Sequence, residues 1–126
     1  MVLSGCCWSA LIAGRTARED REGTPPPPRT ARSSIALAAL RNGARAFVGS
    51  TGENFSPSEP PYDYFAAPLH RAFWASLQAG ASPARALLEA KHAFTLEMPH
   101  DSGRNTIDEA IEFKTVRQYT CLGLGW

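Results

Sequence analysis

Three cysteines and three histidines are the side chains in this 126-residue sequence on which thiol-based chemistry would depend. Two of the cysteines, Cys6 and Cys7, directly follow the short apolar run in the opening stretch "MVLSGCCWS". A thiolate at the end of a strand is an effective nucleophile when a base, a cation or a helix N-terminus lowers its pKa. The pattern makes Cys6 a candidate nucleophile, with Cys7 as the fallback because the alignment can shift by one residue. The simpler interpretation is a small apolar residue buried at a strand end.

The three histidines and the third cysteine do not follow a predicted strand in this way. His70 falls in an amphipathic helical pattern, where a packed structural role is expected, and His92 is expected on a solvated face. His100 lies in a loop, and Cys121 lies in an apolar C-terminal run where core packing is expected. No Cys/His spacing is typical of a zinc site, so we expect neither a metal nor a cofactor.

Composition narrows the classes of partner. Lys and Arg total 13 against 12 Asp and Glu, so no basic face is implied and nucleic acid is not expected as a partner. No apolar stretch reaches the roughly 18 residues of a membrane span, and the five residues before Cys6 are too few for a signal peptide. The odd, low cysteine count favours a reducing compartment, and we expect a cytoplasmic location for the chain as given.

The chain is long enough for one small domain, and its first part divides into three segments. Residues 2–5 read as a short strand, and "CWSALIAG" reads as a turn that enters a short helix ending at Gly14. Residues 15–32 are charged and contain four consecutive prolines. We interpret this stretch as a disordered surface insertion.

Alternating helices and strands are predicted after the insertion. Ser33 or Ser34 caps a helix over 35–40 that stops at Asn42-Gly43, and "ARAFVG" follows as a strand. A polar loop comes next, then helices over 65–80, from Ser82-Pro83, and from Thr106. The apolar tail "YTCLGLGW" is a candidate third strand.

These elements define the expected fold class, which is α/β. Two or three strands cannot close a stable sheet, while the apolar helix faces all need a surface to cover. Buried parallel strands also need neighbours on both edges. The sequence therefore predicts part of a three-layer α/β/α sandwich with a mainly parallel sheet, lacking its N-terminal half.

Three stretches in order, "VLSGCCWS", "ALAALRNGARAFVGST" and "FWASLQAGASPARALLEAKHAF", resemble the C-terminal half of caspase-like cysteine peptidases. The similarity is greatest to the gingipain-type and CHAT-domain branches, with their strand ending in L-S-A-C and a later strand entering G-S. It covers most of residues 1–126 outside the insertion. The tail departs from the family, because the Asp-Pro that follows L-G there is absent here.

The resemblance implies a set of site residues. Cys6, or Cys7, falls on the nucleophile, and backbone amides near Gly5 would stabilise the oxyanion. Ser50 and Thr51 match the strand end that borders the substrate cleft in the family. The family's histidine base precedes the cysteine strand, and no histidine precedes Cys6 here. Separately from the resemblance, Asp63 in the following loop is a candidate for a pocket that takes a basic substrate side chain, although a loop-capping role explains it as well.

The functional expectation is a cysteine-peptidase-like protein that cleaves peptide bonds, as a truncated or inactive fragment whose histidine comes from elsewhere. Expected partners are a peptide or protein substrate and a complementing chain that supplies the missing half. The alternative is a non-catalytic remnant that binds peptide or protein through the loop at 51–63. A nucleotide-binding fragment is disfavoured, because "VGSTGENF" lacks the spacing of a phosphate-binding loop.

Overall fold

The computed structural model describes residues 1–14, 28–98 and 106–124, which form a mixed α/β fold. A three-stranded sheet has β2 at its centre, with β1 parallel to it on one side and β3 antiparallel to it on the other. Leu3 of β1 and Cys121 of β3 both pair with Val48 of β2. The sheet is therefore mixed, and its strands are β1 (Val2–Leu3), β2 (Ala46–Ser50) and β3 (Tyr119–Gly123).

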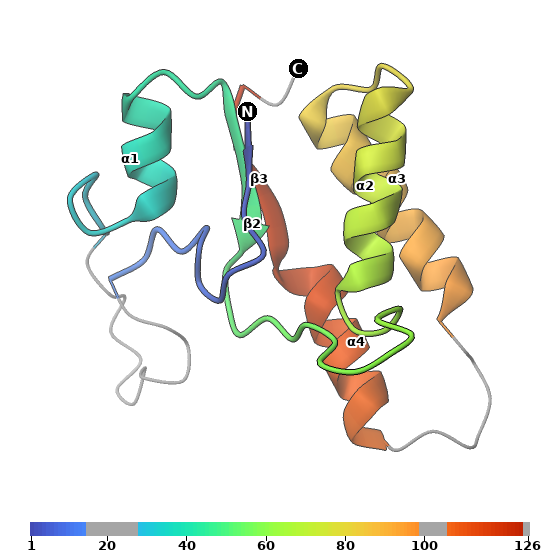
Figure 1. Ribbon diagram of the computed structural model, residues 1–126. Helices are drawn as coiled ribbons and strands as arrows, with labels where there is room; N and C mark the ends of the chain where they lie inside the picture. The colour runs from blue at the N-terminus through green and yellow to red at the C-terminus, as the bar shows by residue number, and fades with distance from the viewer. Residues whose placement is uncertain (15–27, 99–105, 125–126) are drawn as a thin grey trace.

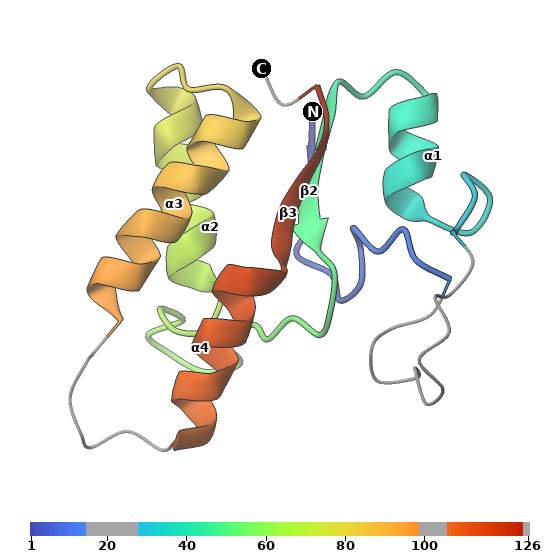
Figure 2. The ribbon, with the colours of Figure 1, turned by 180° about the vertical axis from the view of Figure 1, so that it is seen from behind.

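Helices lie on both faces of this sheet. The described residues form four: α1 (Ile35–Arg41), α2 (Ala67–Gln78), α3 (Pro83–Glu97) and α4 (Thr106–Gln118). In Figure 1, α1 lies to one side of the sheet, and α2 and α3 lie together on the other side. Seen from behind in Figure 2, α4 continues directly into β3, so the last helix delivers the antiparallel strand.

Local signals set the helix boundaries as predicted. Ser34 is the N-cap of α1, and its hydroxyl accepts a hydrogen bond from the Leu37 N–H. Ser82 caps α3 in the same way, with Pro83 at the first helical position. Gly80, which follows α2, has φ +93°, a left-handed conformation that glycine adopts without a steric penalty. These boundaries confirm the predictions for α1, α2 and α3.

Two apolar clusters hold the helices to the sheet. The larger one joins Val48 and Tyr119 of the sheet to buried residues of α2 and α3, among them Leu69 and Phe73. The smaller one joins Phe47, on the opposite face of β2, to Ala36 of α1 and to Ala10. Because successive strand residues point to opposite faces, the all-buried β2 contributes to both clusters.

The turn predicted from Cys7 is present, but the short helix predicted to follow it and to end at Gly14 is wrong, because no helix forms before residue 14. The Trp8 N–H donates to the Gly52 carbonyl and the Ala10 N–H to the Ser50 carbonyl, so both bonds go to the end of β2. So short a helix is marginal on its own, and these long-range bonds replace its ladder. The turn after Cys6 therefore opens no helix. Residues 15–27 of the expected insertion lie outside the described residues.

Candidate functional site

The two N-terminal thiols lie where β1 ends. The Ser4 N–H donates to the Val48 carbonyl (2.9 Å), which extends the parallel pairing one residue beyond β1. Cys6 and Cys7 follow at once, and both are exposed and free. Because β1 and β2 are parallel, the thiols share one end of the sheet with the loop that leaves β2. This end of the sheet is the lower one in Figure 1.

Asn54, in the loop after β2, joins that loop to the thiol segment. Its backbone N–H donates to Cys7 Sγ (3.2 Å), and the Cys7 thiol in turn reaches the Asn54 carbonyl (3.4 Å). Its side-chain Nδ2 donates to the Gly5 carbonyl (2.5 Å). Cys6 has a local contact, in which its N–H donates to Ser4 Oγ (3.3 Å). Of the two thiols, Cys7 is thus the one that contacts the loop after β2.

A histidine lies against the same segment. His70, near the N-terminal end of α2, forms a hydrogen bond of 2.5 Å between its Nε2 and the hydroxyl of Tyr119, the first residue of β3. A Cβ placed on Gly5 would lie 3.4 Å from His70 Cε1. The imidazole edge therefore faces Gly5, the residue before Cys6. The sequence predicted a packed structural histidine and gave no signal that would place it beside residues 65 positions away.

The electrostatics of this cluster keep the imidazole neutral and the phenol protonated. Burial lowers the pKa of His70. Burial also raises the pKa of Tyr119, which rises further through the negative charge of ionised Cys7 and, more weakly, Cys6. A hydrogen bond with the Asn54 side chain opposes that rise. A neutral imidazole near neutral pH can accept a proton, and its Tyr119 partner stays a neutral hydroxyl.

Backbone amides near Gly5 are the donors that the expected oxyanion role would use. The Cys6 N–H donates to Ser4 Oγ and the Trp8 N–H to the Gly52 carbonyl. The N–H groups of Gly5 and Cys7 have no hydrogen-bond partner within the described part of the chain. An oxyanion site needs donors of this kind aimed at one point, and that use of the two amides stays a prediction.

The hydroxyls of Ser50 and Thr51 are occupied by bonds inside the protein. Ser50 is 1% exposed, and its Oγ donates to the Gly52 carbonyl (3.0 Å). Thr51 is half-buried, and its Oγ1 donates to the Gln118 carbonyl (3.1 Å). Both residues lie at the carboxyl end of β2, as predicted. In this arrangement they shape the end of the strand, and direct substrate contact by either stays a prediction.

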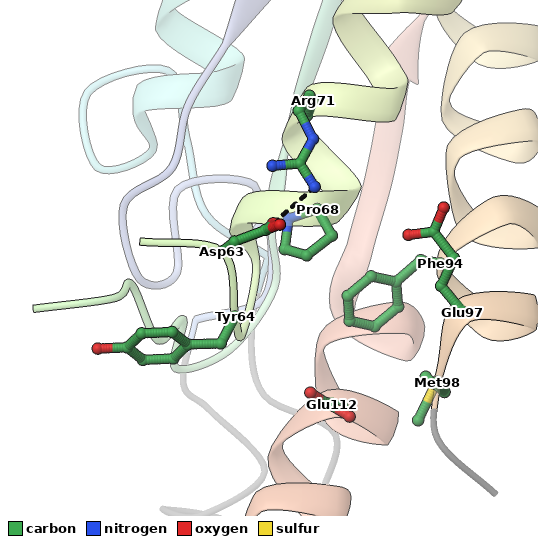
Figure 3. A pocket seen from close by; sticks show the side chains of 8 residues that line it. All are labelled: Asp63, Tyr64, Pro68, Arg71, Phe94, Glu97, Met98 and Glu112. Atoms are coloured by element: carbon green, nitrogen blue, oxygen red, sulfur yellow. Dashed lines mark ion pairs between the residues drawn. The ribbon is translucent and has the colours of Figure 1, made fainter. Parts of the chain in front are cut away.

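Asp63 lines a pocket at the start of α2. The pocket has a volume of about 140 Å³, and Figure 3 shows side chains of α3 and α4 on its other walls, among them Phe94 and Glu112. The Asp63 carboxylate forms an ion pair of 2.6 Å with Arg71, which lines the same pocket. Its charge is thus already matched by a cation of this chain. A basic substrate side chain would have to compete with Arg71 for it.

Cys121 and His92 make none of the contacts described above for Cys7 and His70. Cys121 is half-buried in β3, and burial raises the pKa of its thiol. His92 is exposed on α3, and His100 lies outside the described residues. The described residues contain no group of three or more His, Cys, Asp or Glu side chains that could hold a metal ion. None of the helices described is both long enough and apolar enough to cross a membrane.

The fold and the site together define a mixed α/β protein in which a Cys7–Asn54 pair and a His70–Tyr119 pair lie on either side of Gly5 at one end of the sheet. Comparison with known proteins adds no family to this description: no family model, no curated protein and no solved structure matches the chain.

Proposed function

We propose that this chain is a cysteine-peptidase-like protein, part of a caspase-like α/β/α sandwich with a mainly parallel sheet. The observation that carries the proposal is the exposed Cys6–Cys7 pair at the carboxyl end of β1, beside the carboxyl end of parallel β2. The packing of α1 on one face and of α2 and α3 on the other is in keeping with the sandwich. In the proposed reaction the thiolate attacks a peptide carbonyl carbon, and the amine leaves with a proton.

The outer edge of β1 is the place where we propose that a partner binds. Within the described residues β1 pairs with β2 alone, so its other edge presents unpaired backbone groups. A complementing segment or chain would extend the sheet along this edge. A peptide or protein is the proposed substrate, bound over the loop that leaves β2.

A second candidate function is non-catalytic binding of peptide through the loop at 51–63. It is favoured by the bonds that occupy the hydroxyls of Ser50 and Thr51 and by the Asp63–Arg71 ion pair. Under this alternative, the contacts between Cys7 and Asn54 serve to hold the loop in place.

Peptidyl acyloxymethyl ketones, compared with iodoacetamide, separate the two functions. A peptidase site aligns the ketone with its thiol. We therefore expect the peptidyl probe to modify Cys6 or Cys7 at least about tenfold faster than it modifies Cys121. Cys6→Ala and Cys7→Ala identify which thiol reacts. Equal, slow modification of all three thiols by both reagents would contradict the peptidase and favour the binding remnant.

The same probes test Asp63. An arginyl probe should react faster than an alanyl probe if the Asp63 carboxylate attracts a basic side chain. Asp63→Asn should then remove the difference, while Glu97→Gln, on another wall of the same pocket, should keep it. No preference for the arginyl probe would leave Asp63 with the structural pairing to Arg71 alone.

A further inference from the structure

We propose that Cys7 and His70 are the nucleophile and the general base of this site, with Tyr119 as the residue that positions the imidazole. The inference rests on the proposed function and changes it in two respects. It selects the fallback thiol over Cys6, and it supplies the base from this chain's own α2 in place of a histidine from elsewhere.

The first argument is the position of His70. Three segments from different parts of the chain meet at its ring: the turn after β1 through Gly5, the start of α2, and the start of β3 through Tyr119. The 2.5 Å bond to Tyr119 and the edge-on ring contact, with centroids 5.2 Å apart, fix the ring's orientation. Tyr119 is itself 1% exposed and packs in the larger apolar cluster. A base held by a third group in this way is the usual arrangement for activating a nucleophile.

The second argument concerns which thiol is connected to the residues around His70. The loop residue Asn54 contacts Cys7 Sγ through its backbone and the Gly5 carbonyl through its amide. Cys7 is thus linked through Asn54 to Gly5, which lies beside the His70 ring. Among the described residues, the contact of Cys6 is the local one with Ser4. The charge of ionised Cys7 also acts more strongly on the Tyr119 hydroxyl than that of Cys6.

The third argument is the set of polar groups around Cys7. The Asn54 N–H donates to Cys7 Sγ over 3.2 Å. Asn54 Oδ1 is a buried side-chain oxygen that has no hydrogen-bond partner within the described residues. A buried acceptor in this state is costly in a folded protein, and a proton donor brought in by a substrate, such as a peptide N–H, would satisfy it.

The proton balance is simple. In the tautomer whose Nε2–H donates to Tyr119 Oη, the lone pair of His70 Nδ1 is free to accept the thiol proton. The products are the Cys7 thiolate and an imidazolium, and the Tyr119 hydroxyl keeps its bond to Nε2. When the thiolate forms the S–C bond to a peptide carbonyl, the C–N bond breaks and Nδ1 returns the proton to the leaving amine. Water then hydrolyses the thioester with the neutral imidazole as base.

The test measures thiol alkylation by iodoacetamide in the full chain, in which an S–C bond forms and iodide leaves. Cys6→Ala reports Cys7, Cys7→Ala reports Cys6, and half-buried Cys121 is the reference thiol in each. At about pH 7 we expect Cys7 to react about tenfold faster than Cys6. His70→Gln, which keeps a hydrogen-bonding side chain for Tyr119, should bring the two rates together. His92→Gln, exposed on α3, is the matched control and should change neither rate.

Tyr119→Phe tests the positioning role without removing the buried ring. We expect this substitution to lower the rate of Cys7 alkylation. It should also shift the pH at which that rate changes through the titration of His70. Loss of packing alone would not cause such a shift. Far-UV circular dichroism and thermal unfolding confirm that each variant folds. A fast Cys7 with the wild-type pH profile in Tyr119→Phe would overturn the role of the hydroxyl.

The outcomes separate this inference from the proposed function. A fast Cys7 that His70→Gln leaves unchanged overturns the assignment of His70 while the peptidase-like thiol stands. A fast Cys6 with a slow Cys7 overturns the choice of Cys7 alone. Slow reaction at both thiols in the wild-type chain, with Cys121 no slower, overturns the proposed function together with the inference.

Discussion

The imidazole of His70 and the hydroxyl of Tyr119 are joined by a 2.5 Å hydrogen bond between residues 49 positions apart in the chain. This bond connects α2 to the first residue of β3 directly beside the thiol-bearing turn. Because one partner is an imidazole held in a buried environment, the bond also makes the stability of the fold sensitive to pH.

His70 should make the protein less stable in mild acid. Its pKa is lowered in the folded state, so just below the ordinary histidine value of about 6.5 the unfolded chain binds more protons. The free energy of unfolding should therefore fall as the pH drops through about 6.5 and on toward the lower folded pKa. We expect urea unfolding of His70→Gln to lose less stability than the wild type between about pH 7.5 and about pH 5. His92→Gln should behave as the wild type, and identical pH dependence in all three would contradict the prediction.

The two serine caps should contribute different amounts to the free energy of unfolding. Ser82 only accepts the Arg85 N–H at the start of α3, whereas Ser34 accepts the Leu37 N–H and also donates to the Leu11 carbonyl (3.1 Å). Ser82→Ala should cost about 1 kcal/mol of unfolding free energy, a typical value for a cap. Ser34→Ala should cost about 2 kcal/mol, because a buried carbonyl also loses its donor. Equal losses in chemical denaturation would show that the Leu11 contact contributes nothing.

Leu69 and Leu88 form a matched pair for the core between the helices and the sheet. Leu69 of α2 is 0% exposed, and Leu88 of α3 is 55% exposed. Leu69→Ala leaves a cavity and should lower the free energy of unfolding by about 2–5 kcal/mol. Leu88→Ala, the same change on the surface, should stay within about 0.5 kcal/mol. A loss at Leu88 as large as that at Leu69 would mean that the exposed face of α3 is covered in solution.

Gly49 in β2 is predicted to tolerate no side chain. A Cβ there would lie 2.5 Å from Ser9 Oγ and 2.9 Å from Phe47 Cε1, so Gly49→Ala should destabilise the fold by about 1–3 kcal/mol. Since Ser9 Oγ is one of the two obstructing atoms, the double variant with Ser9→Ala should be more stable than the sum of the single changes by about 1 kcal/mol. If the destabilisation of the double variant in thermal unfolding equals the sum of the single changes, the contact with Ser9 Oγ is not the source of the strain.

The sequence was a sufficient guide wherever the deciding interactions are local. The Ser34 and Ser82 caps, the glycine after α2 and the apolar spacing of Leu69 and Phe73 are all settled within a few residues. Helices α1 to α3 and strand β2 were predicted for this reason. The prediction failed for the short helix ending at Gly14, because bonds from Trp8 and Ala10 to the end of β2 replace a local helical ladder. Local propensity carries no information about such distant partners.

By itself, then, the sequence determined an α/β chain with two thiols at the end of its first strand. Only the tertiary structure decided that the third strand runs antiparallel, that Asn54 contacts Cys7, and that His70 bonds Tyr119 next to Gly5. The physical reason is the range of the forces involved. Helix periodicity and caps act within one or two turns, whereas a site assembled from two strand ends and a helix start depends on how the buried faces of the whole sheet are covered.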